Sequence, residues 1–88
     1  MKYMLKRVID AKYIKDYRIW LKFNDGKSGE IDLAEKISWG EVFEPLRQNI
    51  NFFKNFKIVG STIAWENEAD LAPESLYELL KQQNQNKK

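Results

Sequence analysis

The chain has 88 residues, of which 43% are hydrophobic and 14% aromatic, and its formal net charge is +2. These values predict one small globular domain with a single hydrophobic core, and they argue against an intrinsically disordered chain. No apolar run is long enough to span a bilayer, and no apolar stretch follows the basic residues near the N-terminus, so we expect neither a membrane segment nor a signal peptide.

The chain contains no cysteine and no histidine. Disulfides and thiolate chemistry are therefore excluded, as are the commonest general base and the commonest transition-metal ligand. Serine, tyrosine and carboxylate side chains are present, but none is accompanied by a base that titrates near neutral pH. We therefore expect no enzyme, no cofactor and no metal, and a cytoplasmic location, which suits a protein without cysteine.

Charge is distributed unevenly along the chain. Residues 1–22 hold seven Lys or Arg against Asp10 and Asp16, which gives +5, whereas residues 66–78 hold five carboxylates and no basic residue. The overall charge therefore gives little support to nucleic-acid binding, although a local basic face remains open.

Alternating apolar and polar residues predict two strands, over residues 7–14 and 17–23. In the first, Ile9, Ala11 and Tyr13 would share the buried face. A third strand follows the turn Asn24-Asp25-Gly26. A three-residue loop with Gly26 in the left-handed conformation sets Ile19 opposite Ile31, whereas a two-residue turn would place a carboxylate in the core.

The middle of the chain predicts short helical pieces. Asp32 is placed to cap a turn over residues 33–36, with Glu35 completing a capping box, and the spacing of Ser38 and Glu41 repeats that pattern. Pro45 cannot lie deep inside a helix, so we expect a short or broken helix within residues 40–49. Residues 51–55 are expected to form a link with apolar anchors.

A second hairpin is predicted over residues 56–65, with a two-residue turn at Gly60-Ser61. Its register sets Phe56 across from Trp65 and Ile58 across from Ile63. Pro73 fits the first position of a final helix. Residues 1–80 should form the domain, and residues 81–88 a polar, disordered tail.

The predicted fold class is α+β, with an antiparallel three-stranded meander and a second hairpin, a short irregular helix, and a C-terminal helix packed on the sheet. The side chains expected in its core are Tyr13, Ile19, Leu21, Phe23, Ile31, Ile58, Ile63, Leu76 and Leu80.

Several segments, in this order, resemble a small bacterial family known only as domain of unknown function 2442. They are residues 17–26, Asp32-Leu33, residues 42–46, Phe53 and residues 65–77. This chain departs from the family's usual Trp-Pro-Asn-Gly-Ala-Asp motif, because Glu66 and Glu68 stand in place of its Pro and Gly. The resemblance implies a compact α+β fold and no assigned activity, and some relatives look fused to helix-turn-helix segments or occur as small partner proteins.

A non-catalytic interaction module, binding another protein or itself, is the function that the sequence favours. The aromatic side chain expected in solvent is Trp39, beside Gly40 in an irregular segment, and exposed aromatics often anchor interfaces. The acidic turn before the last helix departs from a calcium loop, because Leu71 and Tyr77 stand where such a loop needs Gly and Glu. Asp70 is instead expected to accept backbone N–H groups at the helix entrance. The candidate partner-binding residues are Trp39, Glu66, Asn67, Glu68 and Asp70.

The alternative is a nucleic-acid-binding accessory or regulatory domain. A tryptophan between cations, as in Arg18-Trp20-Lys22, is suited to stack on bases and contact phosphates. The competing interpretation is that Glu30 and Asp32 neutralise this face and that Trp20 packs under the helical segment. The residues of the alternative site are Lys6, Arg7, Lys12, Arg18, Trp20 and Lys22.

Overall fold

A computed structural model describes residues 5–85 of the chain. Its first sheet is antiparallel, with strand order β1-β2-β3, and a second sheet of two strands pairs β4 with β5. The elements are β1 (Val8–Lys15), β2 (Arg18–Phe23), β3 (Ser28–Asp32), the 3-10 helix η1 (Glu41–Phe43), α1 (Glu44–Gln48), α2 (Ile50–Lys54), β4 (Lys57–Val59), β5 (Thr62–Ala64) and α3 (Pro73–Gln85).

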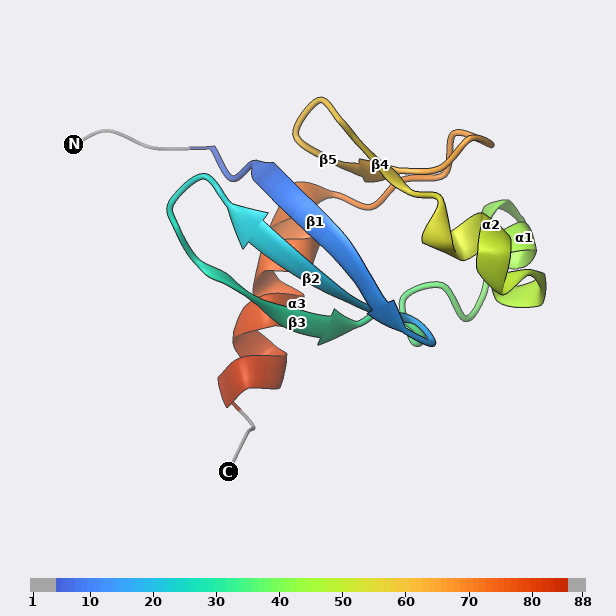
Figure 1. The fold of residues 1–88 in the computed structure, drawn as a ribbon, viewed down its shortest axis with the longest axis horizontal. Helices are drawn as coiled ribbons and strands as arrows, with labels where there is room; N and C mark the ends of the chain where they lie inside the picture. The colour runs from blue at the N-terminus through green and yellow to red at the C-terminus, as the bar shows by residue number, and fades with distance from the viewer. Residues whose placement is uncertain (1–4, 86–88) are drawn as a thin grey trace.

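The helix α3 covers one face of the three-stranded sheet, and the opposite face is left open toward the viewer in Figure 1. The short helices α1 and α2 lie at one end of the molecule, and the β4–β5 hairpin lies beside β1. The α+β architecture predicted from the sequence is therefore confirmed. Among the described residues, no helix has the length and apolar character needed to cross a membrane.

The β2–β3 register is the one that side-chain burial predicts. Ile19 lies opposite Ile31 and Leu21 opposite Gly29. Gly26 has φ +90°, its N–H donates to the Phe23 carbonyl at 2.9 Å, and a methyl group added there would meet nothing within 4 Å. Glycine is therefore required at this position for its backbone conformation and not for space.

The predicted buried face of the first strand is wrong at Ile9. Val8 pairs with Phe23 and Asp10 with Lys22, so the register shifts at Ile9, which is 48% exposed while Val8 is buried. An extra residue in one strand of an antiparallel pair leaves that residue unpaired and reverses the alternation before it. Ala11 and Tyr13 keep the inward side as expected, and both are half-buried against the core.

The capping pattern after β3 is only partly as expected. The Asp32 carboxylate does accept the Ala34 N–H at 2.9 Å, but the Asp32 N–H donates to the side chain of Gln83, so no capping box with Glu35 forms. Ser38 does not cap either: its hydroxyl donates back to the Glu35 carbonyl at 2.7 Å.

The middle helix is broken into short pieces as predicted, with Pro45 in the first turn of α1. The expected link over residues 51–55 is instead the helix α2. Its N-cap is Asn49, whose side chain accepts the Asn51 N–H. The Asn49 capping group had not been recognised in the sequence. The result places Phe53 in the core, fully buried.

The second hairpin has the predicted two-residue turn, with Ile58 opposite Ile63 and Val59 opposite Thr62. Ile63 is fully buried, but Ile58 is 40% exposed, so its assignment to the core is wrong. All three positions of β4 are exposed, whereas the first two positions of β5 are buried, so the hairpin packs on the core through β5.

The C-terminal helix is longer than predicted, because α3 continues through Gln85 instead of ending at residue 80. Residues 86–88 of the predicted tail lie outside the described part of the chain. Seven predicted core residues are buried: Ile19, Leu21, Phe23, Ile31, Ile63, Leu76 and Leu80. The core also contains Val8, Leu33, Ile37, Leu46, Phe53, Trp65 and Ala69, which the predicted core did not include.

Candidate functional site

Trp39 is the most exposed large hydrophobic side chain of the described residues, at 78% of its surface. The prediction that it lies in solvent is confirmed. The loop that carries it is held in place by Arg47, whose Nη1 donates to the carbonyl oxygens of Ile37 at 2.9 Å and Gly40 at 3.0 Å. The Tyr17 hydroxyl in turn donates to the Arg47 carbonyl at 2.9 Å, and Ile37 is buried. The exposed indole therefore projects from a backbone fixed on both sides.

A shallow groove runs from Trp39 along α3. One hollow, of about 330 Å³, is lined by Glu35, Lys36, Trp39 and Leu79. A neighbouring hollow of about 230 Å³ shares Lys36 and Leu79 with it, so the two are adjacent. We call the combined lining the Trp39 surface: Glu35, Lys36, Trp39, Glu74, Ser75, Glu78, Leu79 and Gln82.

The Trp39 surface has an apolar floor and an acidic rim. Trp39 and the half-buried Leu79 supply the apolar area. Its three carboxylates exceed its single ammonium group, Lys36, so its net charge at pH 7 is −2. Glu78 also lies 3.6 Å from Lys81 on the next turn of α3, but both side chains are largely exposed, and such a pair holds its partners weakly.

The acidic turn between β5 and α3 does not join this groove. Asn67 donates from Nδ2 to the Val42 carbonyl at 2.8 Å and accepts the Ala69 N–H, so its side chain fixes the turn against η1. Glu66 and Glu68 are exposed, and Glu68 has the left-handed φ of 71°, at the position where glycine is usual in the family that the sequence resembles. Of the five candidate partner-binding residues, Trp39 alone lines the Trp39 surface. The rest of that lining comes from residues 35–36 and from α3.

The predicted capping role of Asp70 is wrong. Its backbone bridges to Ala64, its side chain is exposed, and none of the hydrogen bonds within residues 5–85 goes to its carboxylate. In the same described range, no group of three or more acidic side chains is arranged to hold a metal ion.

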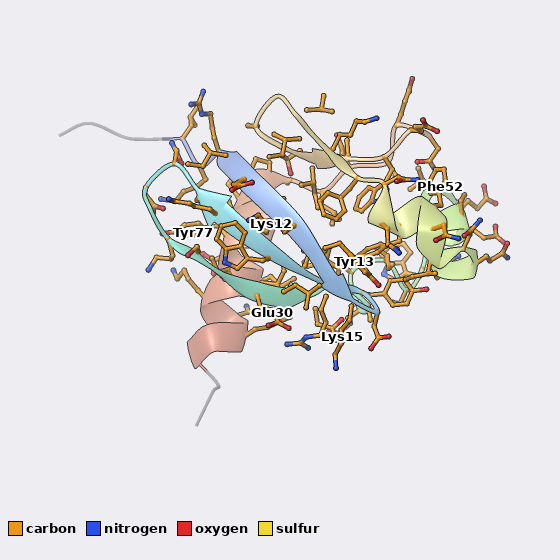
Figure 2. The ribbon with its side chains drawn as sticks, viewed as in Figure 1. Lys12, Tyr13, Lys15, Glu30, Phe52 and Tyr77 are labelled. Carbon is orange, nitrogen blue, oxygen red and sulfur yellow. The ribbon has the colours of Figure 1, made fainter. Side chains whose placement is uncertain are left out.

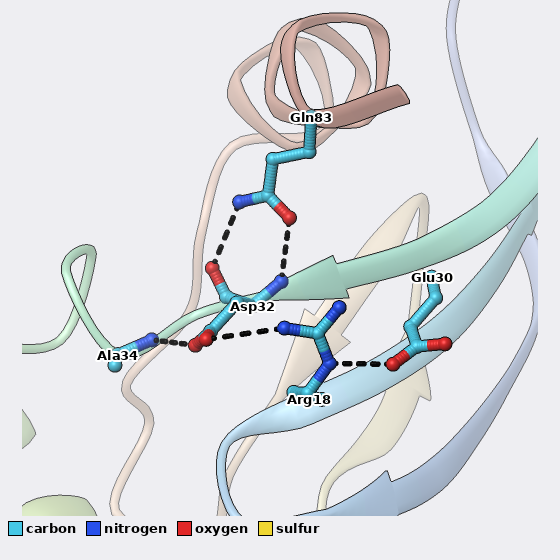
Figure 3. A network of polar contacts seen from close by, with 5 residues as sticks. All are labelled: Arg18, Glu30, Asp32, Ala34 and Gln83. Atoms are coloured by element: carbon cyan, nitrogen blue, oxygen red, sulfur yellow. Dashed lines mark hydrogen bonds and ion pairs between the residues drawn. The ribbon is translucent and has the colours of Figure 1, made fainter. Parts of the chain in front are cut away.

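The open face of the sheet carries Arg18, Trp20 and Lys22. Arg18 forms a hydrogen-bonded ion pair with Glu30 and a second, longer one with Asp32 at 3.4 Å, and Figure 3 shows both. The hydrogen bond to Glu30 raises the pKa of Arg18. Glu30 and Lys12 lie on the outer strands of this sheet (Figure 2). The Lys12 ammonium lies 5.8 Å from the Trp20 ring. Trp20 is half-buried on this open face, so it does not pack under the helical segment.

The remaining basic residues of the predicted nucleic-acid site are set apart. Lys6 lies over the Tyr77 ring at 4.5 Å, and Arg7 pairs through its backbone with Asn24 at the β2–β3 turn. Tyr77 donates to the Asp25 carboxylate at 2.6 Å, which lowers the pKa of Asp25 and raises the pKa of Tyr77. The structure therefore brings Lys12, Arg18, Trp20 and Lys22 onto one face and leaves Lys6 and Arg7 at its end.

Sequence reasoning missed most of the groove. In the sequence Glu35 is expected only to complete a capping box, and the residues of the last helix that line the groove carry no signal of a site. Their helical spacing on α3 places Ser75, Glu78, Leu79 and Gln82 on one face. The sequence indicates this helical face, but it does not indicate that the loop of residues 35–39 lies against it.

The described chain is a small α+β domain whose polar groups mostly hold turns and helix ends. Comparison with known families shows that residues 8–82 match the family described as protein of unknown function (DUF2442), and the chain belongs to it. No curated protein matches the chain. No solved structure matches it either.

Proposed function

We propose that this chain is a non-catalytic interaction module that binds a protein partner through the Trp39 surface. The single observation that carries the proposal is the exposure of Trp39, 78%, on a loop fixed by Arg47. Tryptophan is enriched among the residues that dominate binding energy at protein interfaces. An apolar ring of this size in water gains free energy when a partner covers it.

The fixed loop supports the same proposal through entropy. Association costs free energy when loops and side chains become ordered at the interface, so a loop that is already ordered binds at lower cost. One guanidinium holds the carbonyl groups of Ile37, two residues before Trp39, and of Gly40, directly after it. A structural tryptophan would be turned inward, as Trp65 is, with 4% of its surface exposed.

The setting that we propose is the bacterial cytoplasm. A chain without cysteine forms no disulfide, so it does not depend on an oxidising compartment. The family that the sequence resembles is bacterial. The module carries out no chemistry in this proposal, because neither histidine nor cysteine is present to act as base or nucleophile.

Affinity capture from a bacterial lysate tests the proposal, with Trp39→Ala against the unchanged chain. Ile14→Ala is the matched control, because Ile14 is also an exposed apolar residue, at 42%, but lies on β1. We expect a specific partner whose recovery falls at least about tenfold with Trp39→Ala and is unchanged with Ile14→Ala. Equal recovery by Trp39→Ala and the unchanged chain would contradict the proposal. Sedimentation near millimolar concentration separates a different partner from self-association.

A further inference from the structure

We infer that the partner of the Trp39 surface is a basic protein segment that carries a large apolar side chain. The apolar side chain packs on Leu79 beside Trp39, and flanking Lys or Arg residues pair with Glu74 and Glu78. This inference rests on the proposed function and adds the chemistry of the partner to it.

The groove is large enough to accept one or two side chains of a partner. A volume of about 330 Å³ corresponds to on the order of ten water molecules at about 30 Å³ each. That space accepts a leucine, methionine or phenylalanine side chain. The adjoining hollow of about 230 Å³ continues along α3 over Ser75 and Gln82, so the partner lies as an extended or helical segment along the helix.

The acidic rim selects the charge of that segment. Glu74 lies in the first turn of α3 and is exposed, so its carboxylate faces solvent beside the groove. Glu78 has only the weak, exposed pair with Lys81, so its carboxylate remains available to an incoming cation. Complementary charge at the rim of an interface raises the association rate and rejects partners of the wrong sign.

The same charge argues against a two-fold dimer through this surface. In a two-fold interface each copy presents the same patch, so a patch of net charge −2 would face its own image. A head-to-tail contact with the basic strands of another copy repeats from copy to copy as a ring or an open filament, and Arg18 on those strands is already paired with Glu30 and Asp32. Phosphate-bearing partners are repelled by the three carboxylates. A basic segment of a different protein is neither repelled by the carboxylates nor forced to repeat from copy to copy.

A random peptide library displayed on phage tests the inference with the full chain as bait. Sequences that also bind Trp39→Ala are removed, so only those that depend on Trp39 remain. We expect the remaining peptides to be enriched in Lys and Arg, with at least one Leu, Ile, Met or Phe. The affinity of a leading peptide should fall about tenfold with Glu74→Gln combined with Glu78→Gln, and it should fall as salt is raised.

The matched control combines Glu41→Gln with Glu44→Gln, which removes the same charge from exposed positions on η1 and α1 outside the groove. This control should leave the affinity within about twofold. Peptides that depend on Trp39 without any basic enrichment, or that bind the Glu74 and Glu78 variant unchanged, would overturn the inference and leave the proposed function standing. A library that yields no Trp39-dependent peptide would overturn both.

Discussion

Trp39 and Trp65 show how differently one chain treats the same residue type. Trp65 is 4% exposed, packs against Phe53 and Phe56, and donates its indole N–H to the Phe53 carbonyl at 2.9 Å. Trp39 is 78% exposed. The free energy of burying a tryptophan is thus already realised for Trp65 on folding, and it is still obtainable for Trp39 on binding.

Replacing Trp65 should therefore destabilise the fold, and replacing Trp39 should not. In Trp65→Phe the Phe53 carbonyl loses its donor in a buried setting, and part of the ring volume is lost, so we expect a loss of about 1–3 kcal/mol in the free energy of unfolding. Trp39→Phe is the matched control and should change it by less than about 0.5 kcal/mol. Urea unfolding followed by circular dichroism measures both. A loss of similar size in the two variants would mean that Trp39 is part of the folded core.

The contact between Tyr77 and Asp25 should make stability depend on pH at both ends of the range. The Tyr77 hydrogen bond lowers the pKa of Asp25, so this contribution is present above the unfolded pKa and is lost as the pH falls through the folded value, below about pH 4. The Asp25 hydrogen bond raises the pKa of Tyr77, so that contribution is lost as the pH rises beyond about 10.

Tyr77→Phe should flatten both limbs of this profile, as followed by thermal unfolding from pH 3 to pH 11. Tyr13→Phe is the matched control, since its ring also packs edge-on against a phenylalanine, with centroids 6.1 Å apart. If Tyr13→Phe flattens the limbs equally, the pH dependence does not come from the Asp25 contact.

At the scale of the elements, Gln83 joins α3 to the outer edge of β3. The Asp32 N–H donates to Gln83 Oε1 at 2.9 Å, and Gln83 Nε2 donates to the Asp32 carbonyl at 3.2 Å, as Figure 3 shows. The primary amide thus makes the pair of bonds that a neighbouring strand would make. Exposed edge strands invite pairing with other chains, so this contact also closes part of the edge.

Gln83→Ala should cost about 1–2 kcal/mol in the free energy of unfolding, because two backbone groups of Asp32 lose their partner. The Asp32 amide should also exchange its hydrogen faster. Gln82→Ala is the matched control: Gln82 is the exposed neighbour on the same helix and makes no contact with Asp32. Protection of Asp32 that is the same in both variants would show that Gln83 does not hold the strand edge.

The sequence predicts those elements whose cause is local. The β2–β3 register follows from the two faces of residues 17–23 and from Gly26, and the β4–β5 turn follows from Gly60-Ser61. Pro45 and Pro73 mark the starts of α1 and α3. In each case one short segment decides the geometry, because burial fixes register and proline fixes the backbone angle.

The sequence does not predict features that depend on distant segments. The bulge at Ile9 follows a docking contact in which the Val8 N–H donates to the Ser61 carbonyl at 2.9 Å. In the sequence Gln83 belongs to the predicted polar tail, and nothing nearby indicates that its side chain bonds to Asp32 on β3. The exposure of Trp39 could be predicted, because Gly40 marks an irregular segment locally. The groove could not, because it forms only where that segment meets α3.

At the scale of the whole molecule, charge is balanced on the open sheet face and unbalanced in the groove. The open face carries Lys12, Lys15, Arg18 and Lys22 against Asp10, Glu30 and Asp32, a net charge of +1. Arg18, at its centre, is engaged by two carboxylates. Phosphate binding needs cations without protein partners, so the folded arrangement works against the nucleic-acid hypothesis even though the residues that prompted it share a face.

Removing the neutralising carboxylates should therefore strengthen the binding of nucleic acid by this face. Glu30→Gln combined with Asp32→Asn leaves one side-chain oxygen at each position, which at residue 32 can still accept the Ala34 N–H, but it removes the two negative charges paired with Arg18 and raises the face from +1 to +3. We expect the unchanged chain to bind single-stranded DNA weakly, with a shallow dependence on salt. The variant should bind more tightly and lose affinity more steeply as salt rises, because each phosphate contact releases counterions.

Glu66→Gln combined with Glu68→Gln, on the exposed acidic turn, is the matched control. It changes the net charge by the same amount and should have little effect on DNA binding. A steep salt dependence in the unchanged chain would show that the open face already binds phosphates and would restore the nucleic-acid hypothesis.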